Sequence, residues 1–272
     1  MKDKLKGFPK IFALSLEEGV ERKANFIKQA EELELDYHIV EVKRYPGCGT
    51  IIEGNTYDHL LHFAPDASKT TTAVAANHIR MIREWLKTSS PDEKYAVFCE
   101  DDISFETVEH WPFNWDEFTK IIPSDVKILQ LCLIKGDLDY TLQLIPRTSW
   151  HWGANAYLVS RGYAERIVRR FCYSGNENLF NISTTAQEIG TYNPCLPEDV
   201  LFCDDRFDES YMWQDMSGFY MIPLLIEDIK QDSFFNDDRE DAYAYAASHH
   251  RCHINTLKLW KEYNKEVKKW NK

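Results

Sequence analysis

A short apolar run that ends in acidic residues constrains the fold more than any other feature of this sequence. Residues 95–99 are apolar or aromatic at every position, and Glu100, Asp101 and Asp102 follow them directly. A strand that is apolar on both faces is typical of a sheet covered by helices on both sides. In open α/β sheets, ligands bind beyond the carboxyl ends of the strands, and the three carboxylates would lie at such an end.

The N-terminal part of the chain predicts a strand, a helix and a second strand. Residues 10–16 and 37–42 are short β-like runs, and residues 18–33 carry apolar side chains near helical spacing. A strand–helix–strand unit of this kind favours parallel pairing through a crossover helix. The opening segment therefore indicates an α/β fold.

The rest of the chain continues the alternation of helices and strands. We expect helices at residues 70–87, 162–171 and 255–270 and strands at residues 126–134, 155–159 and 219–226. Internal repeats, low-complexity tracts and a clear linker are absent from the sequence. We therefore expect a single α/β domain over residues 1–272, in which residues 236–272 form a helical C-terminal extension.

Charge and cysteine content exclude several classes of protein. The 32 basic and 44 acidic residues give a net charge of -12, which argues against a nucleic-acid partner. Apolar runs are far shorter than the ~20 residues of a transmembrane segment, and the first residues lack a signal-peptide pattern. The seven cysteines are odd in number and include no CxxC pair, so reduced, buried thiols and a cytoplasmic location are expected. The sequence indicates no oligomeric state.

The acidic triplet can bind a cation. Three adjacent carboxylates repel one another unless a positive charge is shared between them. If the segment stays extended, Glu100 and Asp102 lie on one side and Asp101 points away. Such a pair of oxygen ligands suits Mg²⁺ or Mn²⁺. The alternative is a solvated acidic turn or a set of caps for the next helix.

The sequence also resembles the family 25 glycosyltransferases, which are lipopolysaccharide and procollagen sugar transferases. Four stretches carry the resemblance: Ser15-Leu16 with Arg22, residues 73–78 (AVAANH), residues 98–103 (FCEDDI) and residues 152–167 (WGANAYLVSRGYAERI). The chain departs from the family pattern at Ser15, where the family has Asn, and around His78, where Ala73, Val74 and Asn77 replace Gly, Cys and Ser.

The resemblance implies a GT-A-like fold, which is a Rossmann-related mixed sheet flanked by helices, here with a C-terminal helical tail. It also implies inverting transfer of glucose or galactose from a UDP-sugar and dependence on Mn²⁺, with Mg²⁺ possible. The acceptor would be a hydroxyl of a glycan or of hydroxylysine in a collagen-like chain. The metal would neutralise the donor diphosphate and stabilise the leaving group.

By the same resemblance, individual residues acquire roles. Asp102 would bind the metal, with Glu100 or Asp101 holding the ribose or completing the metal shell. A late histidine adds a ligand in many GT-A enzymes, and His253 is the candidate beside His249 and His250; the alternative is a polar approach to a helix. Arg22 would pair with the donor diphosphate, or else lie on a helix surface.

The acceptor side of the reaction has its own candidates. Inversion requires a general base, for which we select Asp199, with Glu198 behind it, at the expected start of a short helix; an ordinary N-terminal helix acid is the alternative. Trp152 could stack on a sugar ring, and Asn155 could line the same site. Two other functions stay open: a carboxylate- or metal-dependent glycan hydrolase, and a non-catalytic relative that binds nucleotide or sugar.

Overall fold

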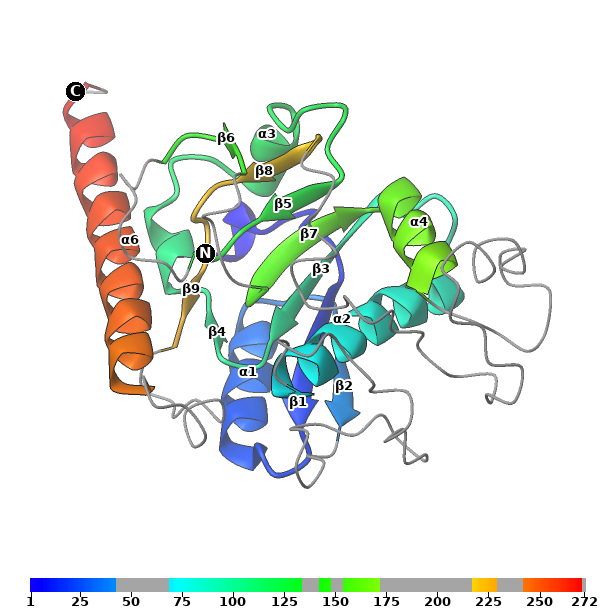
Figure 1. The fold of residues 1–272 in the computed structure, drawn as a ribbon. Helices are drawn as coiled ribbons and strands as arrows, with labels where there is room; N and C mark the ends of the chain where they lie inside the picture. Colours follow the sequence, from blue (N-terminus) through cyan, green and yellow to red (C-terminus); the bar gives the residue numbers. More distant parts are fainter. Residues whose placement is uncertain (43–68, 134–141, 148–153, 172–216, 229–241, 271–272) are drawn as a thin grey trace, which may run out of the picture.

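A mixed β-sheet with helices on both faces organises the chain (Figure 1). The computed structural model describes residues 1–42, 69–133, 142–147, 154–171, 217–228 and 242–270. Within these residues a seven-stranded sheet has the order β2-β1-β3-β7-β5-β8-β6, and β4 and β9 form a separate two-stranded sheet. The expected α/β class, a mixed sheet flanked by helices with a helical C-terminal tail, is confirmed.

The elements have the following bounds. The strands are β1 (Ile11–Leu16), β2 (Tyr37–Val42), β3 (Tyr95–Glu100), β4 (Ile103–Ser104), β5 (Ile128–Gln130), β6 (Ile145–Pro146), β7 (Ala156–Ser160), β8 (Phe219–Met221) and β9 (Ile226–Glu227). The helices are α1 (Val20–Glu32), α2 (Lys69–Thr88), α3 (Trp115–Thr119), α4 (Arg161–Phe171) and α6 (Ala242–Trp270), with 3-10 turns at Lys2–Lys4 and Glu106–His110.

The first three strands form a doubly wound unit. Strand β1 pairs in parallel with both β2 and β3, so it lies between them. The chain leaves β1 through α1 to reach β2 on one side and then crosses through α2 to reach β3 on the other. The carboxyl ends of β1 and β3 therefore flank a point where the direction of chain connection reverses, which is where open α/β sheets bind ligands.

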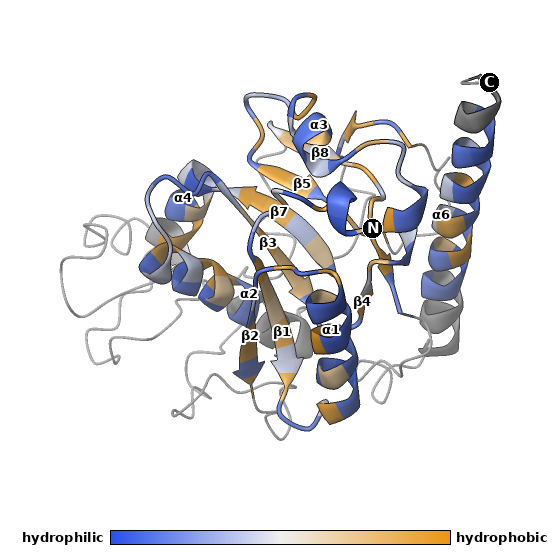
Figure 2. Cartoon of the chain, turned by 180° about the vertical axis from the view of Figure 1, so that it is seen from behind, coloured by the Kyte–Doolittle hydropathy of each residue, from blue (hydrophilic) through white to orange (hydrophobic). Residues whose placement is uncertain are grey.

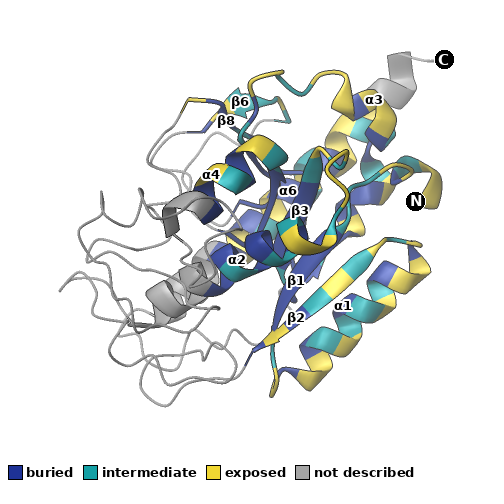
Figure 3. Cartoon of the chain, turned by 90° about the vertical axis from the view of Figure 1, so that its right-hand side faces the viewer, coloured by how far each residue is buried: buried dark blue, intermediate teal, exposed yellow. Residues whose placement is uncertain are grey.

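Alternation of side chains along the strands creates two cores. On one face Phe12 and Phe98 pack with Ile82 of α2 and with α4, and on the other Ile11 and Val97 pack with Phe26 of α1. Figure 2 shows the apolar strands between helices whose outer sides are more hydrophilic. Figure 3 shows β1 as a buried strand and exposed positions along the outer sides of α1 and α4. The α1 face also holds aromatic side chains of α3 and of the 3-10 turn region.

The long C-terminal helix α6 runs along the side of the molecule opposite α2 and α4 (Figure 1). Its Trp260 is fully buried and donates a hydrogen bond from Nε1 to the Pro223 carbonyl oxygen at 2.6 Å. This contact fixes α6 against the segment between β8 and β9. Among the helices of the described ranges, none has the length and apolarity that a bilayer crossing requires.

Several element boundaries differ from those expected from the sequence. The apolar run 126–134 contributes only the short strand β5, and the expected strand 219–226 is divided into β8 and β9. Pro223 lies between them and has no N–H to donate, so the ladder cannot continue through it. Helix α6 begins at Ala242 instead of residue 255, while α3 and the strand β4 were not anticipated.

A buried histidine lies in the centre of the α2 face. His78 of α2 is fully buried, and its Nδ1 lies 2.9 Å from the Tyr157 hydroxyl of β7. Burial lowers the pKa of His78 to about 4 because the charged imidazolium would lose its hydration.

This histidine makes stability sensitive to acid. The pKa of His78 is lower in the folded than in the unfolded state. The stability that depends on neutral His78 is therefore fully present above about pH 6.5 and is lost as the pH falls toward about 4. We expect this loss to reach about 3 kcal/mol. Denaturant unfolding across this pH range should show a weaker dependence in His78→Gln than in the wild type. The exposed His38 supplies the control, since His38→Gln should leave the pH dependence of the unfolding free energy unchanged. If both variants show the same pH dependence, His78 is not its cause.

Candidate functional site

The acidic triplet lies where β1, β3 and α1 meet. Strand β3 ends at Glu100, and a turn at residues 101–102 follows beside the last residues of β1. Arg22 is in the first turn of α1, directly after β1. The two parallel strands and the helix that connects β1 to β2 therefore direct their polar side chains to one place, which is the reversal point described above.

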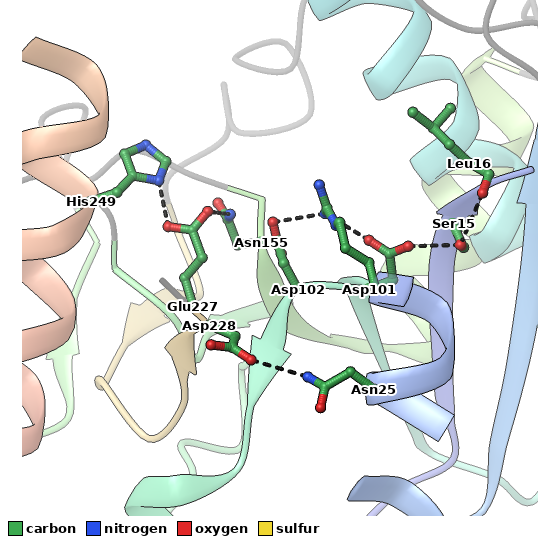
Figure 4. Close-up of polar contacts among 10 residues, drawn as sticks. Ser15, Leu16, Asn25, Asp101, Asp102, Asn155, Glu227, Asp228 and His249 are labelled. Atoms are coloured by element: carbon green, nitrogen blue, oxygen red, sulfur yellow. Dashed lines mark hydrogen bonds and ion pairs between the residues drawn. The ribbon is translucent and has the colours of Figure 1, made fainter. Parts of the chain in front are cut away.

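A chain of polar contacts joins these elements (Figure 4). The Ser15 hydroxyl donates to Asp101 Oδ2 at 2.7 Å. Arg22 Nη2 donates to Asp101 Oδ1 at 2.6 Å and to Asp102 Oδ2 at 2.8 Å. All four residues are buried, with 9% of Arg22 exposed. One guanidinium nitrogen thus bridges two carboxylates inside the protein.

This arrangement corrects two expectations from the sequence. An extended segment would turn Asp101 away from Asp102, but the chain turns after Glu100 and both aspartates meet the same nitrogen of Arg22. The turn is favoured because it lets the single guanidinium compensate two charges. The alternative of Arg22 as a surface helix residue is also wrong, because its side chain is buried against these carboxylates.

Negative charge at the site exceeds the positive charge that compensates it. Burial raises the pKa of Asp102 to about 7, and Glu227 and Asp101 act in the same direction while Arg22 opposes them. Burial also raises the pKa of Glu100 well above its usual range, and the negative charge of Asp102 is the second cause. Burial raises the pKa of Asp101 to a lesser extent because Arg22 and the Ser15 hydroxyl favour its ionised form. When all three carboxylates are ionised, the single charge of Arg22 therefore does not balance them.

The residues present fit a divalent cation in charge and ligand chemistry. Asp102 Oδ1 is buried and has no hydrogen-bond partner, although its Oδ2 is held by Arg22. A buried carboxylate oxygen without a partner is unfavourable, and oxygen is the ligand that Mg²⁺ and Mn²⁺ prefer. In the part of the chain with described coordinates, no three His, Cys, Asp or Glu side chains form a metal site by themselves. Asp102 is thus the residue best suited to hold such an ion.

A second polar group, which the sequence did not indicate as a unit, lies beside the first. Glu227 of β9 contacts His249 Nδ1 of α6 through Oε2 and accepts a hydrogen bond at 3.3 Å from the Asn155 amide through Oε1 (Figure 4). The next residue, Asp228, donates its backbone N–H to the Asp102 carbonyl oxygen at 2.5 Å. These contacts bring α6 and the strand before α4 to the acidic turn.

Sequence reasoning missed Glu227 for an identifiable reason. It comes near Asp102 only because β4 and β9 pair, with Ile103 opposite Glu227, although the two strands are far apart in the chain. The local sequence carries no signal for that pairing. The position of Glu227 directly after a mostly apolar run, residues 219–226, is the only hint in the sequence.

The remaining predicted site residues fall into two groups. Asn155 lies within the site, and His253 is close to it, with Nδ1 2.5 Å from the Glu227 carbonyl oxygen. The positions of Asp199, Glu198 and Trp152 lie outside the described residues. The structure therefore brings together Arg22 and the acidic triplet with Asn155.

Comparisons with known proteins give structural neighbours only. No protein-family model and no curated protein matches the sequence. One similar structure is a glycosyltransferase involved in glycosylation of the major capsid of PBCV-1, with 10% identity over 89% of this chain and 99% of that one and a TM-score of 0.32. Another is a mutant of the Drosophila β1,4-galactosyltransferase 7 with manganese, UDP-Gal and xylobiose, with 12% identity over 86% of this chain and 79% of that one and a TM-score of 0.30. Both TM-scores are low, so the function is argued below from the residues of this chain.

The excess charge predicts that Asp102 reduces stability at neutral pH. The pKa of Asp102 is higher in the folded than in the unfolded state. The stability that depends on protonated Asp102 is therefore fully present below about pH 4 and is lost as the pH rises through about 7. With a chelator present, Asp102→Asn should be more stable than the wild type above pH 7, by up to about 4 kcal/mol. The difference in the free energy of unfolding should vanish near pH 4.

The exposed Asp92 provides the matched control, since Asp92→Asn removes the same charge from a surface turn. Its stability should follow that of the wild type at every pH. An Asp102→Asn variant that is less stable than the wild type at pH 8 would show that Arg22 fully compensates this carboxylate.

Proposed function

We propose that this protein is a glycosyltransferase that uses a divalent cation, Mn²⁺ or Mg²⁺, and a UDP-sugar donor. One observation carries the proposal: buried carboxylates in excess of their counter-charges lie at the reversal point between β1 and β3, and Asp102 Oδ1 has no partner there. The resemblance of the acidic segment to the family 25 glycosyltransferases gives the reaction class.

A cation at this site would complete the charge balance. Asp102 would be its direct protein ligand, with Glu100 as the second candidate; His253, next to the Glu227 carbonyl, is the expected late histidine. Few protein ligands suffice, because Mg²⁺-type sites commonly bind through one or two carboxylates plus substrate phosphates. The bound ion would neutralise the diphosphate and stabilise the charge that develops on the leaving group.

The residues of the chain hold Asp102 in one orientation. The Ser15 hydroxyl fixes Asp101, Asp101 shares Arg22 with Asp102, and Arg22 therefore holds Asp102 Oδ2 in place. Because Oδ2 is held by Arg22 in the protein without ligands, Oδ1 is the oxygen of Asp102 that is left for a cation. Asn155, with Trp152 before it in the chain, would contact the sugar or the acceptor. We propose that residues 1–272 form one such domain, with residues 236–272 as its helical extension.

The transfer would be a single displacement with inversion. The acceptor is a hydroxyl of a glycan or of hydroxylysine in a collagen-like chain. Its oxygen bonds to the anomeric carbon of glucose or galactose, the bond from that carbon to the diphosphate breaks, and the hydroxyl proton passes to a carboxylate. Asp199 is proposed as that carboxylate, with Glu198 behind it.

The donor and metal assignments predict a linked thermal shift. A ligand that binds only the folded state raises its stability, so UDP with MnCl₂ should raise the melting temperature by several degrees. UDP with a chelator should give a smaller shift. Asp102→Asn should lose the Mn²⁺-dependent part, whereas Asp92→Asn should keep it. If UDP with Mn²⁺ leaves the melting temperature of the wild type unchanged, the transferase proposal fails.

The proposed base predicts a separation of transfer from binding. Asp199→Asn should lower the rate of sugar transfer by about 10²-fold to 10⁴-fold while the UDP- and Mn²⁺-induced thermal shift stays intact. Glu198→Gln serves as the neighbouring control and should lose less activity. Retention of near-normal transfer by folded Asp199→Asn would exclude Asp199 as the base. Sugar release to water without a nucleotide donor would instead indicate a hydrolase, and UDP binding without turnover would indicate a binding protein.

A further inference from the structure

Arg22 is a buried charge that forms ion pairs with Asp101 and Asp102. Nine-tenths of the residue is removed from solvent, and a buried guanidinium is stable only when carboxylates compensate it. Asp102, Asp101 and Glu100 raise the pKa of Arg22 although burial acts in the opposite direction. The guanidinium is therefore bound to the acidic turn in the protein without ligands.

The contact geometry resembles that of a bridging cation. A single nitrogen, Nη2, lies 2.6 Å from Asp101 Oδ1 and 2.8 Å from Asp102 Oδ2. A divalent ion held by those two oxygens would approach them more closely than Nη2 does, at about 2.0–2.1 Å for Mg²⁺, and would need the space that Nη2 fills. The two positive groups cannot occupy that space together. Of the buried oxygens of the two aspartates, Asp102 Oδ1 has no partner, so the acidic turn is only partly accessible to a metal while Arg22 stays in place.

We propose that Arg22 is an internal counter-cation that competes with the divalent metal for Asp101 and Asp102, and that an anionic diphosphate releases the competition by drawing the guanidinium to itself. The second half of this inference rests on the proposed UDP-sugar donor.

The chemistry of the two partners favours such an exchange. A guanidinium binds phosphate oxygens through parallel hydrogen bonds as readily as it binds carboxylates. Glu100 and Glu227 remain near the turn after Arg22 leaves, and carboxyl oxygens are ligands that divalent ions prefer. Metal and diphosphate would then bind cooperatively, and the coupling must be equal in both directions.

Isothermal titration calorimetry with MnCl₂ tests the competition without any nucleotide. Arg22→Gln removes the competing charge, so it should bind Mn²⁺ at least tenfold more tightly than the wild type. Lys28→Gln, on the exposed side of the same helix, removes the same charge and should not change the affinity. The melting temperature of Arg22→Gln should also rise more on addition of Mn²⁺ than that of the wild type.

The same titrations with UDP present test the release. The wild type should bind Mn²⁺ more tightly with UDP than without it, whereas the Mn²⁺ affinity of Arg22→Gln should be nearly independent of UDP. If Arg22→Gln proves unstable without metal, it is purified with MnCl₂, and Arg22→Lys, which keeps the charge without the planar fork, should show a smaller gain in Mn²⁺ affinity.

The outcomes separate this inference from the proposed function. Unchanged or weaker Mn²⁺ binding by Arg22→Gln, or by Arg22→Lys if the former does not fold, overturns the competition. Mn²⁺ binding that fails in every variant overturns it as well. A tenfold gain in Arg22→Gln with no response to UDP in any variant supports the competition, contradicts the release by diphosphate and counts against the proposed donor.

Discussion

The ion pair of Arg22 with Asp101 and Asp102 is the interaction on which the site depends. It joins the first turn of α1 to the turn after β3, and the Ser15 hydroxyl adds the end of β1. Removing Arg22 would leave two buried carboxylates without compensation, which costs several kcal/mol, whereas removing Asp102 would leave Arg22 paired with Asp101. The three elements that meet here therefore constrain one another, and the position of Asp102 follows from the doubly wound topology.

The site nevertheless remains electrostatically unfavourable by itself. Burial of Asp102 and Glu100 raises both pKa values, and one arginine does not compensate the acidic groups around it. The two cores beneath the site offset this cost, since Phe98 and Val97 bury opposite faces of the strand that carries the triplet. Groups whose pKa is shifted by burial and by neighbouring charges are common at functional sites. A cation or a proton would relieve the excess negative charge, and the proposed function depends on the cation.

Local patterns predicted the parts of the molecule that depend on local sequence. The apolar run 95–99 gave a strand buried on both faces, and the segment 10–42 gave a parallel unit. Contacts between segments far apart in the sequence could not be predicted. The pairing of β4 with β9 brings Glu227 to the acidic turn, and the residues around Glu227 carry no pattern that predicts this pairing. The helix α3 did carry a signal, because Asn114 and Glu117 form a capping box whose spacing is visible in the sequence. The orientation of Asp101 required the position of Arg22, which only the packing of α1 determines.

Helix α6 belongs to the same network as the acidic turn. Trp260 fixes the helix to the Pro223 carbonyl, and His249 and His253 contact the side chain and backbone of Glu227. Strand β9, which carries Glu227, pairs with β4 directly after Asp102, and the Asp228 N–H donates to the Asp102 carbonyl. A displacement of α6 would therefore reach Asp102 through one short strand pair. Because the network is continuous, the C-terminal helix contributes to the orientation of the carboxylate proposed to hold the metal.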